Sequence, residues 1–310
     1  MKKTTLSPLI TEKYGYDARF AFLGSCFSQH LSNRLVNKAF DVFAQPYGVI
    51  FNPLSLAEIF FNDRADWQSS VFDREGIYLS WMAHSSVYGL KAEVLEKQLI
   101  HQQSRFFQFL ENTNVLFVTF GTAWVYMLKN DHRVVANCHK MPNELFVKRC
   151  LSSAEITELW GKVVQKCQKV NPQLKVVLTV SPVRHTKDGL VNNNKSKAQL
   201  ITAAHELSER HQALEYFPAY ELIIDELRDY AYFERDGIHP NSLAVDRVED
   251  YFMETYIKEK SRSVLREYEK LKRLQEHRPI HPESEGHKQF LRQLEEQKRA
   301  FTEKYPHFSF

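Results

Sequence analysis

The sequence lacks the patterns that mark disulfide-rich, Cys-x-x-Cys metal-binding or membrane-spanning proteins. Its 310 residues include four cysteines, and none of them forms a Cys-x-x-Cys pair or a disulfide-framework spacing. No apolar run approaches the roughly 20 residues that cross a bilayer. Glu12 and Lys13 interrupt the N-terminal segment before it reaches the length of a secretion signal. These absences predict a cytoplasmic protein with reduced cysteines and no membrane association.

The sequence also lacks a large excess of positive or negative residues, because its formal net charge is only +3. The excess lies from Glu259 onward, where 12 Lys and Arg residues stand against 9 Asp and Glu residues. The rest of the chain is balanced, whereas nucleic-acid binding normally leaves a basic patch. We therefore expect no nucleic-acid partner.

Short apolar segments alternate with amphipathic segments of helical length along the first 220 residues. This alternation predicts an α/β fold with a doubly wound parallel sheet in three α/β/α layers, of the flavodoxin-like kind. The strands are expected at Arg19–Leu23, Val42–Gln45, Asn114–Phe120, Lys175–Val180 and Leu214–Phe217. The helices are expected at Ser28–Phe40, Leu54–Phe61, Glu93–Leu110 and Ser152–Val170.

Two segments interrupt this rhythm and are predicted to form β-hairpins. Ser70–Val87 and Ala123–Ala136 alternate apolar and polar residues around turn-forming residues. Both stand where strand-to-helix loops are expected, at the edge where open α/β sheets bind ligands. We expect the hairpins to cover a site there.

The composition changes after Tyr256 to Glu, Lys, Arg and Leu in helical patterns. The segment Arg278–Pro282 contains two prolines that must interrupt a helix. We therefore predict a first domain over residues 1–258 and a helical hairpin over residues 259–310. That hairpin could fold on the body or join two copies of the chain into a homo-oligomer.

The strand at Arg19–Leu23 runs into Gly24, Ser25 and Cys26, and a helix is expected directly afterwards. Helix N-terminal N–H groups stabilise a developing negative charge. Such a position can also lower the pKa of a thiol from its free value of about 8.5. Cys26 is therefore the preferred nucleophile and Ser25 the alternative. A buried cysteine beside a helix-capping serine explains the segment equally well.

Asp236 and His239 lie three residues apart in a turn before the helix expected at Ser242. A carboxylate that holds one imidazole nitrogen leaves the other free to take a proton from a nucleophile. Alternatively, the Asp caps a turn beside an exposed His. With the Gly24-Ser25-Cys26 turn early in the chain, the pair indicates an acyl-transfer site on an α/β sheet.

The sequence resembles the GSCFA family, a branch of the SGNH/GDSL hydrolase-like superfamily. Gly24–Phe27 reads Gly-Ser-Cys-Phe, and Ser28 replaces the alanine that completes the family signature. The resemblance extends over roughly residues 18–256 and leaves out the tail. Its further segments are Thr119–Trp124, Asn137–Lys140, Ser181–His185 and Asp236–Pro240.

The resemblance implies catalytic roles for particular positions. The superfamily's nucleophilic serine corresponds to Cys26, and its late Asp-x-x-His pair corresponds to Asp236 and His239. The superfamily's Gly-x-Asn-Asp block, whose asparagine helps to hold the oxyanion, falls on Gly121–Trp124, where Ala123 replaces the asparagine. Loss of one oxyanion donor typically costs about 10²–10³ in rate.

Other groups could supply the missing donor or contact the substrate. Gly121 offers a backbone N–H, and Asn137 and Arg184 offer side-chain donors. We also include His84, His139 and His185 as substrate-binding candidates, although His139 and His185 are more readily explained as structural histidines. His84, Cys138 and His139 could instead join Cys26 and His239 around a zinc ion, although their spacing matches no compact zinc motif.

Three functions follow from these patterns. The leading one is a hydrolase or acyltransferase that acts without a cofactor or metal on an ester or thioester of a small molecule or glycan. The second is an SGNH-like binding or scaffold protein that has lost catalysis, as the replacement at Ala123 suggests. The third is a metal-dependent hydrolase.

Overall fold

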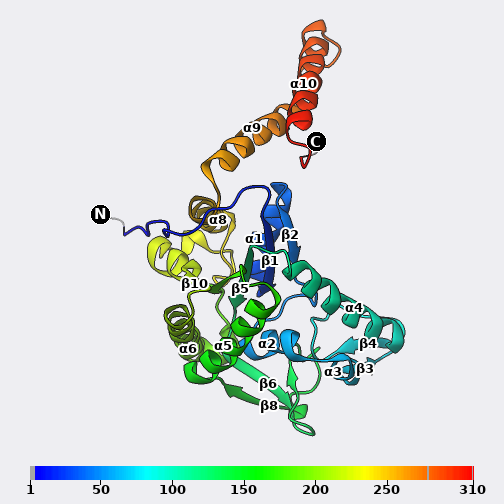
Figure 1. Cartoon of the computed structure of the whole chain (residues 1–310), viewed down its shortest axis with the longest axis vertical. Helices are drawn as coiled ribbons and strands as arrows, with labels where there is room; N and C mark the ends of the chain where they lie inside the picture. The colour runs from blue at the N-terminus through cyan, green and yellow to red at the C-terminus, as the bar shows by residue number, and fades with distance from the viewer. Residues whose placement is uncertain (1–3, 278, 309) are drawn as a thin grey trace.

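A parallel five-stranded sheet forms the centre of the chain in the computed structural model, which describes residues 4–277, 279–308 and 310. The strand order is β10-β9-β5-β1-β2, and every neighbouring pair is parallel (Figure 1). The predicted doubly wound sheet is confirmed, with every strand boundary within one residue of its expected position. The strands are β1 (Arg19–Gly24), β2 (Asp41–Ala44), β5 (Val115–Phe120), β9 (Lys175–Val180) and β10 (Leu214–Phe217).

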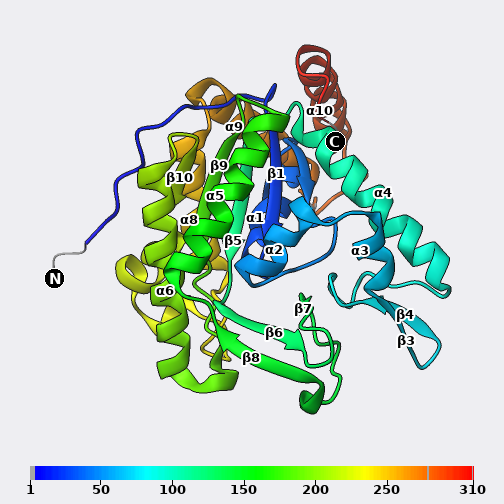
Figure 2. The same cartoon turned by 60° about the horizontal axis from the view of Figure 1, so that its bottom comes forward.

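Helices cover both faces of this sheet because its central strands carry apolar side chains on both faces. In β5, Val115 and Phe117 enter one hydrophobic core, whereas Leu116 and Val118 enter the other. The predicted three-layer arrangement is therefore confirmed (Figure 2). One face is covered by α1 (Cys26–Asn37) and α8 (Ser242–Tyr256), and the other by α2 (Pro53–Phe61), α4 (Ala92–Leu110), α5 (Ser153–Val170) and α6 (Gly189–Arg210).

Two small antiparallel sheets project beyond the central one. The hairpin of β3 (Val71–Arg74) and β4 (Ile77–Ser80) confirms the first predicted insertion. The second insertion has three strands instead of the predicted two, in the order β7-β6-β8. Its third strand was missed because its residues, Phe-Val-Lys-Arg-Cys, do not alternate cleanly between apolar and polar. The strands are β6 (Trp124–Leu128), β7 (Val134–Val135) and β8 (Phe146–Cys150).

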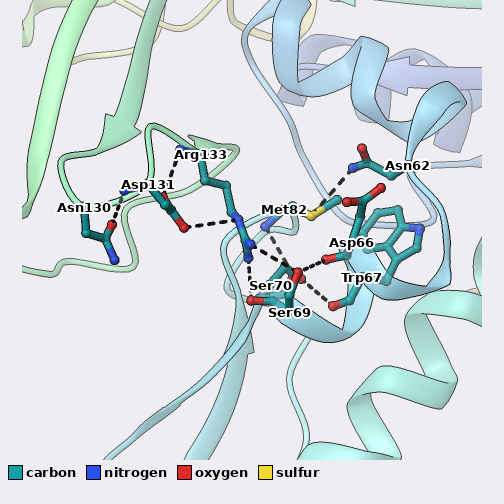
Figure 3. A network of polar contacts seen from close by, with 10 residues as sticks. Asn62, Asp66, Trp67, Ser69, Ser70, Met82, Asn130, Asp131 and Arg133 are labelled. Atoms are coloured by element: carbon teal, nitrogen blue, oxygen red, sulfur yellow. Dashed lines mark hydrogen bonds and ion pairs between the residues drawn. The ribbon is translucent and has the colours of Figure 1, made fainter.

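Arg133 links the two insertions (Figure 3). Its guanidinium donates to the Ser69 carbonyl oxygen and, at 3.1 Å, to the Ser69 hydroxyl at the end of α3 (Arg64–Ser69). Asp131 holds the same guanidinium from the β6–β7 turn, with 3.7 Å between its Oδ2 and the Arg133 Nε. This contact fixes the second insertion against the element that leads into the first.

Glu58 on α2 lies within charge range of Arg133 and Asp66, and burial raises its pKa to about 7. A carboxyl with a folded-state pKa above its unfolded value of about 4.3 destabilises the fold as the pH rises between those two values. We expect Glu58→Gln to increase the free energy of unfolding at pH 8, on the order of 2 kcal/mol, and to change it little at pH 4. Urea unfolding of both proteins at the two pH values measures this. Equal differences at pH 4 and pH 8 would contradict it.

The tail forms the predicted helical hairpin of α9 (Glu259–Gln275) and α10 (Glu285–Lys304). Of the expected break at residues 278–282, position 278 lies outside the described residues. Tyr268 packs against Phe301 and Phe308, and Phe308 also contacts the ring of Tyr16, with 4.8 Å between the ring centroids. The hairpin is therefore anchored to the N-terminal segment of the body. Self-association through it stays a prediction.

Short helical turns complete the described structure. None of its helices within residues 4–277, 279–308 and 310 combines the length and apolar character required to cross a membrane. The short elements are α7 (Ala219–Glu221), η1 (Asn143–Leu145), η2 (Thr186–Asp188), η3 (Leu222–Leu227) and η4 (Tyr230–Tyr232).

Candidate functional site

Gly24 makes the turn that brings the candidate nucleophile to the sheet edge. Its φ of +123° lies in a region that side chains rarely adopt. Its N–H donates to Gln45 Oε1 at 3.2 Å, and the N–H of Ser25 donates to the Thr119 carbonyl oxygen at 3.3 Å. The chain thereby leaves β1 beside the end of β5 and places Cys26 as the first residue of α1.

The N-terminus of α1 leaves its first amide groups available. Ser25 stands at the N-cap, but its side chain makes no capping hydrogen bond. The backbone amides of Cys26 and Phe27 lie beside the Cys26 sulfur at the start of this helix. Burial raises the pKa of the Cys26 thiol, while these two amides and the charge of Lys197 act in the opposite direction. A negative charge on or beside this sulfur would therefore meet two N–H donors.

Ser25 and Cys26 differ in how they are presented. Ser25 is only 1% exposed, and its hydroxyl has no hydrogen-bond partner among the described residues. Cys26 is partly exposed and sits at the uncapped amide groups. The geometry favours Cys26 over Ser25 as the nucleophile.

Asp236 and His239 form an oriented pair in the loop before α8. Asp236 Oδ2 lies 2.7 Å from His239 Nδ1, and Oδ1 accepts the N–H groups of Ile238 and His239 at 2.8 and 3.0 Å. The hydrogen bonds to His239 and Ile238 lower the pKa of Asp236 to about 2. Because a carboxylate can only accept, Nδ1 carries the proton and Nε2 is left to exchange protons.

The two halves of the predicted site lie at the same region of the sheet without direct contact. Among the described residues, no hydrogen bond joins the Cys26 sulfur to the His239 ring. His239 instead interacts electrostatically with His185, which interacts with Lys197, which interacts with Cys26.

Lys197 is a site residue that sequence reasoning missed. It lies on α6, is 2% exposed, and donates from Nζ to the carbonyl oxygens of Gly121 and Ser181 at 2.6 Å each. Burial lowers its pKa to about 7. Its spacing from the apolar residues Leu200 and Ala204 places Lys197 on the same face of the helix as these residues, which is the face that packs on the core. This spacing could have predicted a buried lysine.

The structure corrects the role expected for Gly121. Its N–H already donates to the Phe51 carbonyl oxygen at 2.7 Å, so it is not free to hold an oxyanion. The neighbouring amide of Ala123 is engaged as well, because it donates to Ser196 Oγ at 2.7 Å. At the start of α1, by contrast, the Ser25 side chain makes no capping hydrogen bond to the first amides.

Both ring nitrogens of His139 are engaged within the protein. Nε2 lies 2.8 Å from the Ser80 carbonyl oxygen and Nδ1 lies 2.9 Å from Ser85 Oγ, in a buried position. Asn137 accepts the N–H of His139 at 2.7 Å. A substrate-binding role for His139 and a donor role for the Asn137 amide stay predictions.

The remaining candidates lie around the same edge. His84 pairs with Ser86 at 2.9 Å, and burial lowers its pKa. The ring of His185 meets Phe51 edge-on, and burial together with Lys197 lowers its pKa to about 4, so it is neutral at pH 7.

Arg184 stacks over Phe233, with 5.6 Å from its Cζ to the ring centroid. Phe233 pairs with Pro240, next to His239. Arg184 therefore lies beside the loop that carries His239, and a donor role for its guanidinium stays a prediction.

The zinc alternative finds no support in the arrangement of ligands. Within the part of the chain that the structure describes, His, Cys, Asp and Glu side chains form no group of three or more that could hold a metal ion. His139, one of the proposed ligands, has both nitrogens engaged.

Comparisons with known proteins identify family models that match most of the chain. The GSCFA family matches residues 19–252, and the GSCFA domain protein C-terminal domain matches residues 268–310. A comparison with curated proteins finds no match.

Among solved structures, similar chains include a Clostridium thermocellum family 3 carbohydrate esterase, with 9% identity and a TM-score of 0.37, covering 80% of this chain and 97% of that one. A Corynascus thermopiles (Myceliophthora fergusii) carbohydrate esterase family 2 enzyme plus carbohydrate-binding domain has 12% identity and a TM-score of 0.41, with coverages of 80% and 67%. A Talaromyces cellulolyticus carbohydrate esterase family 3 structure has 11% identity and a TM-score of 0.35, with coverages of 80% and 98%.

Proposed function

This chain belongs to the GSCFA family, whose match covers residues 19–252, and we propose that it is a hydrolase or acyltransferase that uses Cys26 as its nucleophile. Two features support the proposal: the oriented Asp236–His239 pair and the helix N-terminus at Cys26, where the Ser25 side chain makes no capping hydrogen bond. The observation that carries the proposal is the position of Cys26. Cys26 is partly exposed and is the first residue of α1, and while burial raises the pKa of its thiol, the amides of Phe27 and Cys26 oppose that rise. The Asp236–His239 pair at 2.7 Å supplies an imidazole that can move protons.

The proposed reaction has two steps. In the first, the Cys26 sulfur attacks the carbonyl carbon of an ester or thioester, and its proton passes to His239 Nε2. The amides of Cys26 and Phe27 hold the oxyanion, and the carbon–oxygen or carbon–sulfur bond to the leaving group breaks as that group takes the proton back. In the second, His239 activates water or an acceptor alcohol, which attacks the acyl-Cys26 thioester and restores the thiol. Asp236 orients the ring throughout.

The acyl donor that we propose is an ester or thioester of a small molecule or a glycan. Arg184 supports a donor with oxygen-rich groups, because its guanidinium stands beside the loop that carries His239.

The test is to trap the acyl intermediate. The protein is mixed with an aryl acetate or an acetyl thioester, quenched in acid within the first turnover, digested and examined by mass spectrometry. We expect acetylation of the peptide that contains Cys26. Cys138→Ala, which removes a different partly exposed thiol, should give the same label. Acetylation confined to a hydroxyl, or an unlabelled Cys26 during measurable turnover, would refute the assignment.

A binding protein that has lost catalysis is the second candidate. It is favoured by the engaged amides of Gly121 and Ala123, since the superfamily draws part of its oxyanion stabilisation from this block. Saturable binding of glycan esters without acylation of Cys26 would distinguish it from the enzyme.

A further inference from the structure

Ser85, which follows the first hairpin, contacts a histidine from the loop between β7 and β8. Oγ of Ser85 lies 2.9 Å from Nδ1 of His139, and Nε2 of the same ring lies 2.8 Å from the carbonyl oxygen of Ser80. Ser80 is the buried last residue of β4. A hydroxyl, an imidazole and a carbonyl oxygen therefore form one chain of hydrogen bonds between the two insertions.

These contacts determine which nitrogen of the His139 ring carries the proton. A backbone carbonyl oxygen can only accept, so Nε2 is the donor to Ser80. Burial lowers the pKa of His139, so the ring is neutral at pH 7 and carries one proton. Nδ1 is then an acceptor, and the Ser85 hydroxyl donates to it. The hydroxyl proton therefore lies on a nitrogen that can take it.

The imidazole is held rigidly, whereas the serine is open to solvent. His139 is 1% exposed, and its ring lies edge-on to those of Phe72 and Trp81, with 5.5 and 5.9 Å between ring centroids. A guanidinium N–H of Arg74 donates to the His139 carbonyl oxygen. Ser85 is exposed. A base that a third group fixes beside a reachable hydroxyl is the arrangement that activates a serine as a nucleophile.

Ser85 and His139 line a pocket of about 460 Å³. Its charged side chains are those of Arg74, Lys140 and Glu75, so two cations stand against one carboxylate. The apolar part of the wall consists of Ile77, Leu79 and Tyr88. A pocket of this size holds a small organic molecule, and this lining suits one with an apolar part and a negative charge.

We propose that Ser85 is a site of self-acylation, with His139 as its general base and a small, negatively charged ester as the acyl donor. The site is separate from the one proposed around Cys26. Within the described residues, neither member of the Ser85–His139 pair hydrogen-bonds to Cys26 or His239. Acylation of Ser85 therefore does not depend on the reaction proposed for Cys26.

The reaction transfers one acyl group to the chain. Oγ of Ser85 attacks the carbonyl carbon of the ester while its proton passes to Nδ1 of His139, and Nε2 keeps its proton on the Ser80 carbonyl oxygen. Arg74 and Lys140 line the same pocket and offset the charge of the oxyanion. The carbon–oxygen bond to the leaving alcohol then breaks, and the alcohol takes the proton from Nδ1.

The acyl group then stays on the serine. His139 is 1% exposed, and the acylated Oγ of Ser85 covers the nitrogen that served as base. Water therefore does not reach this base to hydrolyse the acyl-serine. Each chain accepts one acyl group, so the site adds nothing to steady-state turnover.

The experiment acylates the whole protein with mono-4-nitrophenyl succinate. Samples are treated with neutral hydroxylamine, which removes acyl groups from cysteine, and are then digested and sequenced by tandem mass spectrometry. We expect the succinyl group on Ser85, approaching one per chain. In His139→Gln, which lacks the base, we expect labelling at least about 100-fold slower. An unlabelled Ser85, or an equal rate in His139→Gln, would overturn the inference.

Ser86→Ala is the matched control. Ser86 is also exposed, and its Oγ lies 2.9 Å from Nδ1 of His84, but within the described residues no carbonyl oxygen holds Nε2 of that ring. We expect Ser86→Ala to leave the labelling of Ser85 unchanged. If His139→Gln does not fold, Ser85 and Ser86 are compared in the unaltered protein, and equal labelling of the two would overturn the inference.

Two further variants test the independence of the site and its substrate class. Cys26→Ala should label Ser85 at the unaltered rate, whether or not the proposed function holds, and loss of the label would show transfer from Cys26 and overturn a separate site. Lys140→Gln should slow labelling by the succinate ester about threefold and leave labelling by 4-nitrophenyl acetate unchanged. Equal effects on the two esters would overturn the preference for a negative charge.

Discussion

Replacing Cys26 with alanine lowers kcat/KM for an aryl ester or thioester by at least about 10³-fold, because the variant has no group that can form the acyl intermediate. The substitution removes one sulfur from a partly exposed position at the start of α1. The alanine suits a helix, so the fold is expected to persist. Steady-state kinetics with a chromogenic ester, together with circular dichroism of the variant, measures the effect.

Ser25→Ala is the matched control, because it alters the adjacent residue by a single oxygen atom. Its hydroxyl is buried and makes no hydrogen bond within the described structure, so we expect less than about a tenfold change in kcat/KM. The reverse pattern, with Cys26→Ala active and Ser25→Ala inactive, would transfer the nucleophile to Ser25. Full activity in both variants would exclude this turn as the catalytic site.

The central sheet could be predicted from the sequence because its strands are short, apolar on both faces and separated by amphipathic helices. A strand such as Val115–Phe120, buried along its entire length, carries a signal that does not depend on its partners. Phe146–Cys150 carries no such signal. It becomes a strand because it pairs with Trp124–Leu128, a tertiary contact that local sequence does not specify.

The site divides in the same way between local and distant interactions. Asp236 and His239 are three residues apart, so their hydrogen bond could be inferred from a turn. The engagement of the Gly121 amide could not, because its acceptor, Phe51, lies 70 residues earlier and reaches it by crossing the end of the sheet. Lys197 donates to two backbone carbonyl oxygens. Every residue type has such a carbonyl, so the identity of the residue does not mark the contact. Such partners leave no trace in the sequence.

Gly24→Ala destabilises the protein by at least about 4 kcal/mol, a loss that is a large part of the stability of a typical domain. A Cβ at this position would overlap the carbonyl oxygen of Thr119 and lie 2.8 and 2.9 Å from its N and C atoms. These are backbone atoms of β5, the central strand, so they cannot move away as a flexible side chain would. The φ of +123° adds strain for any residue with a side chain. Urea unfolding, or soluble yield if the variant does not fold, measures the loss.

Gly76→Ala separates the backbone collision from the strain. Gly76 also has a positive φ, of +83°, but a Cβ there meets nothing within 4 Å. We expect it to cost only about 1–2 kcal/mol, the usual penalty of a left-handed conformation for alanine. Similar losses of stability in the two variants would show that Gly24 does not pack closely against the Thr119 backbone. Cys26 would then be free to shift relative to β5. A much larger loss at Gly24 means that packing of the first strand against the central strand fixes Cys26 in place, and that the turn before Cys26 tolerates no side chain at position 24.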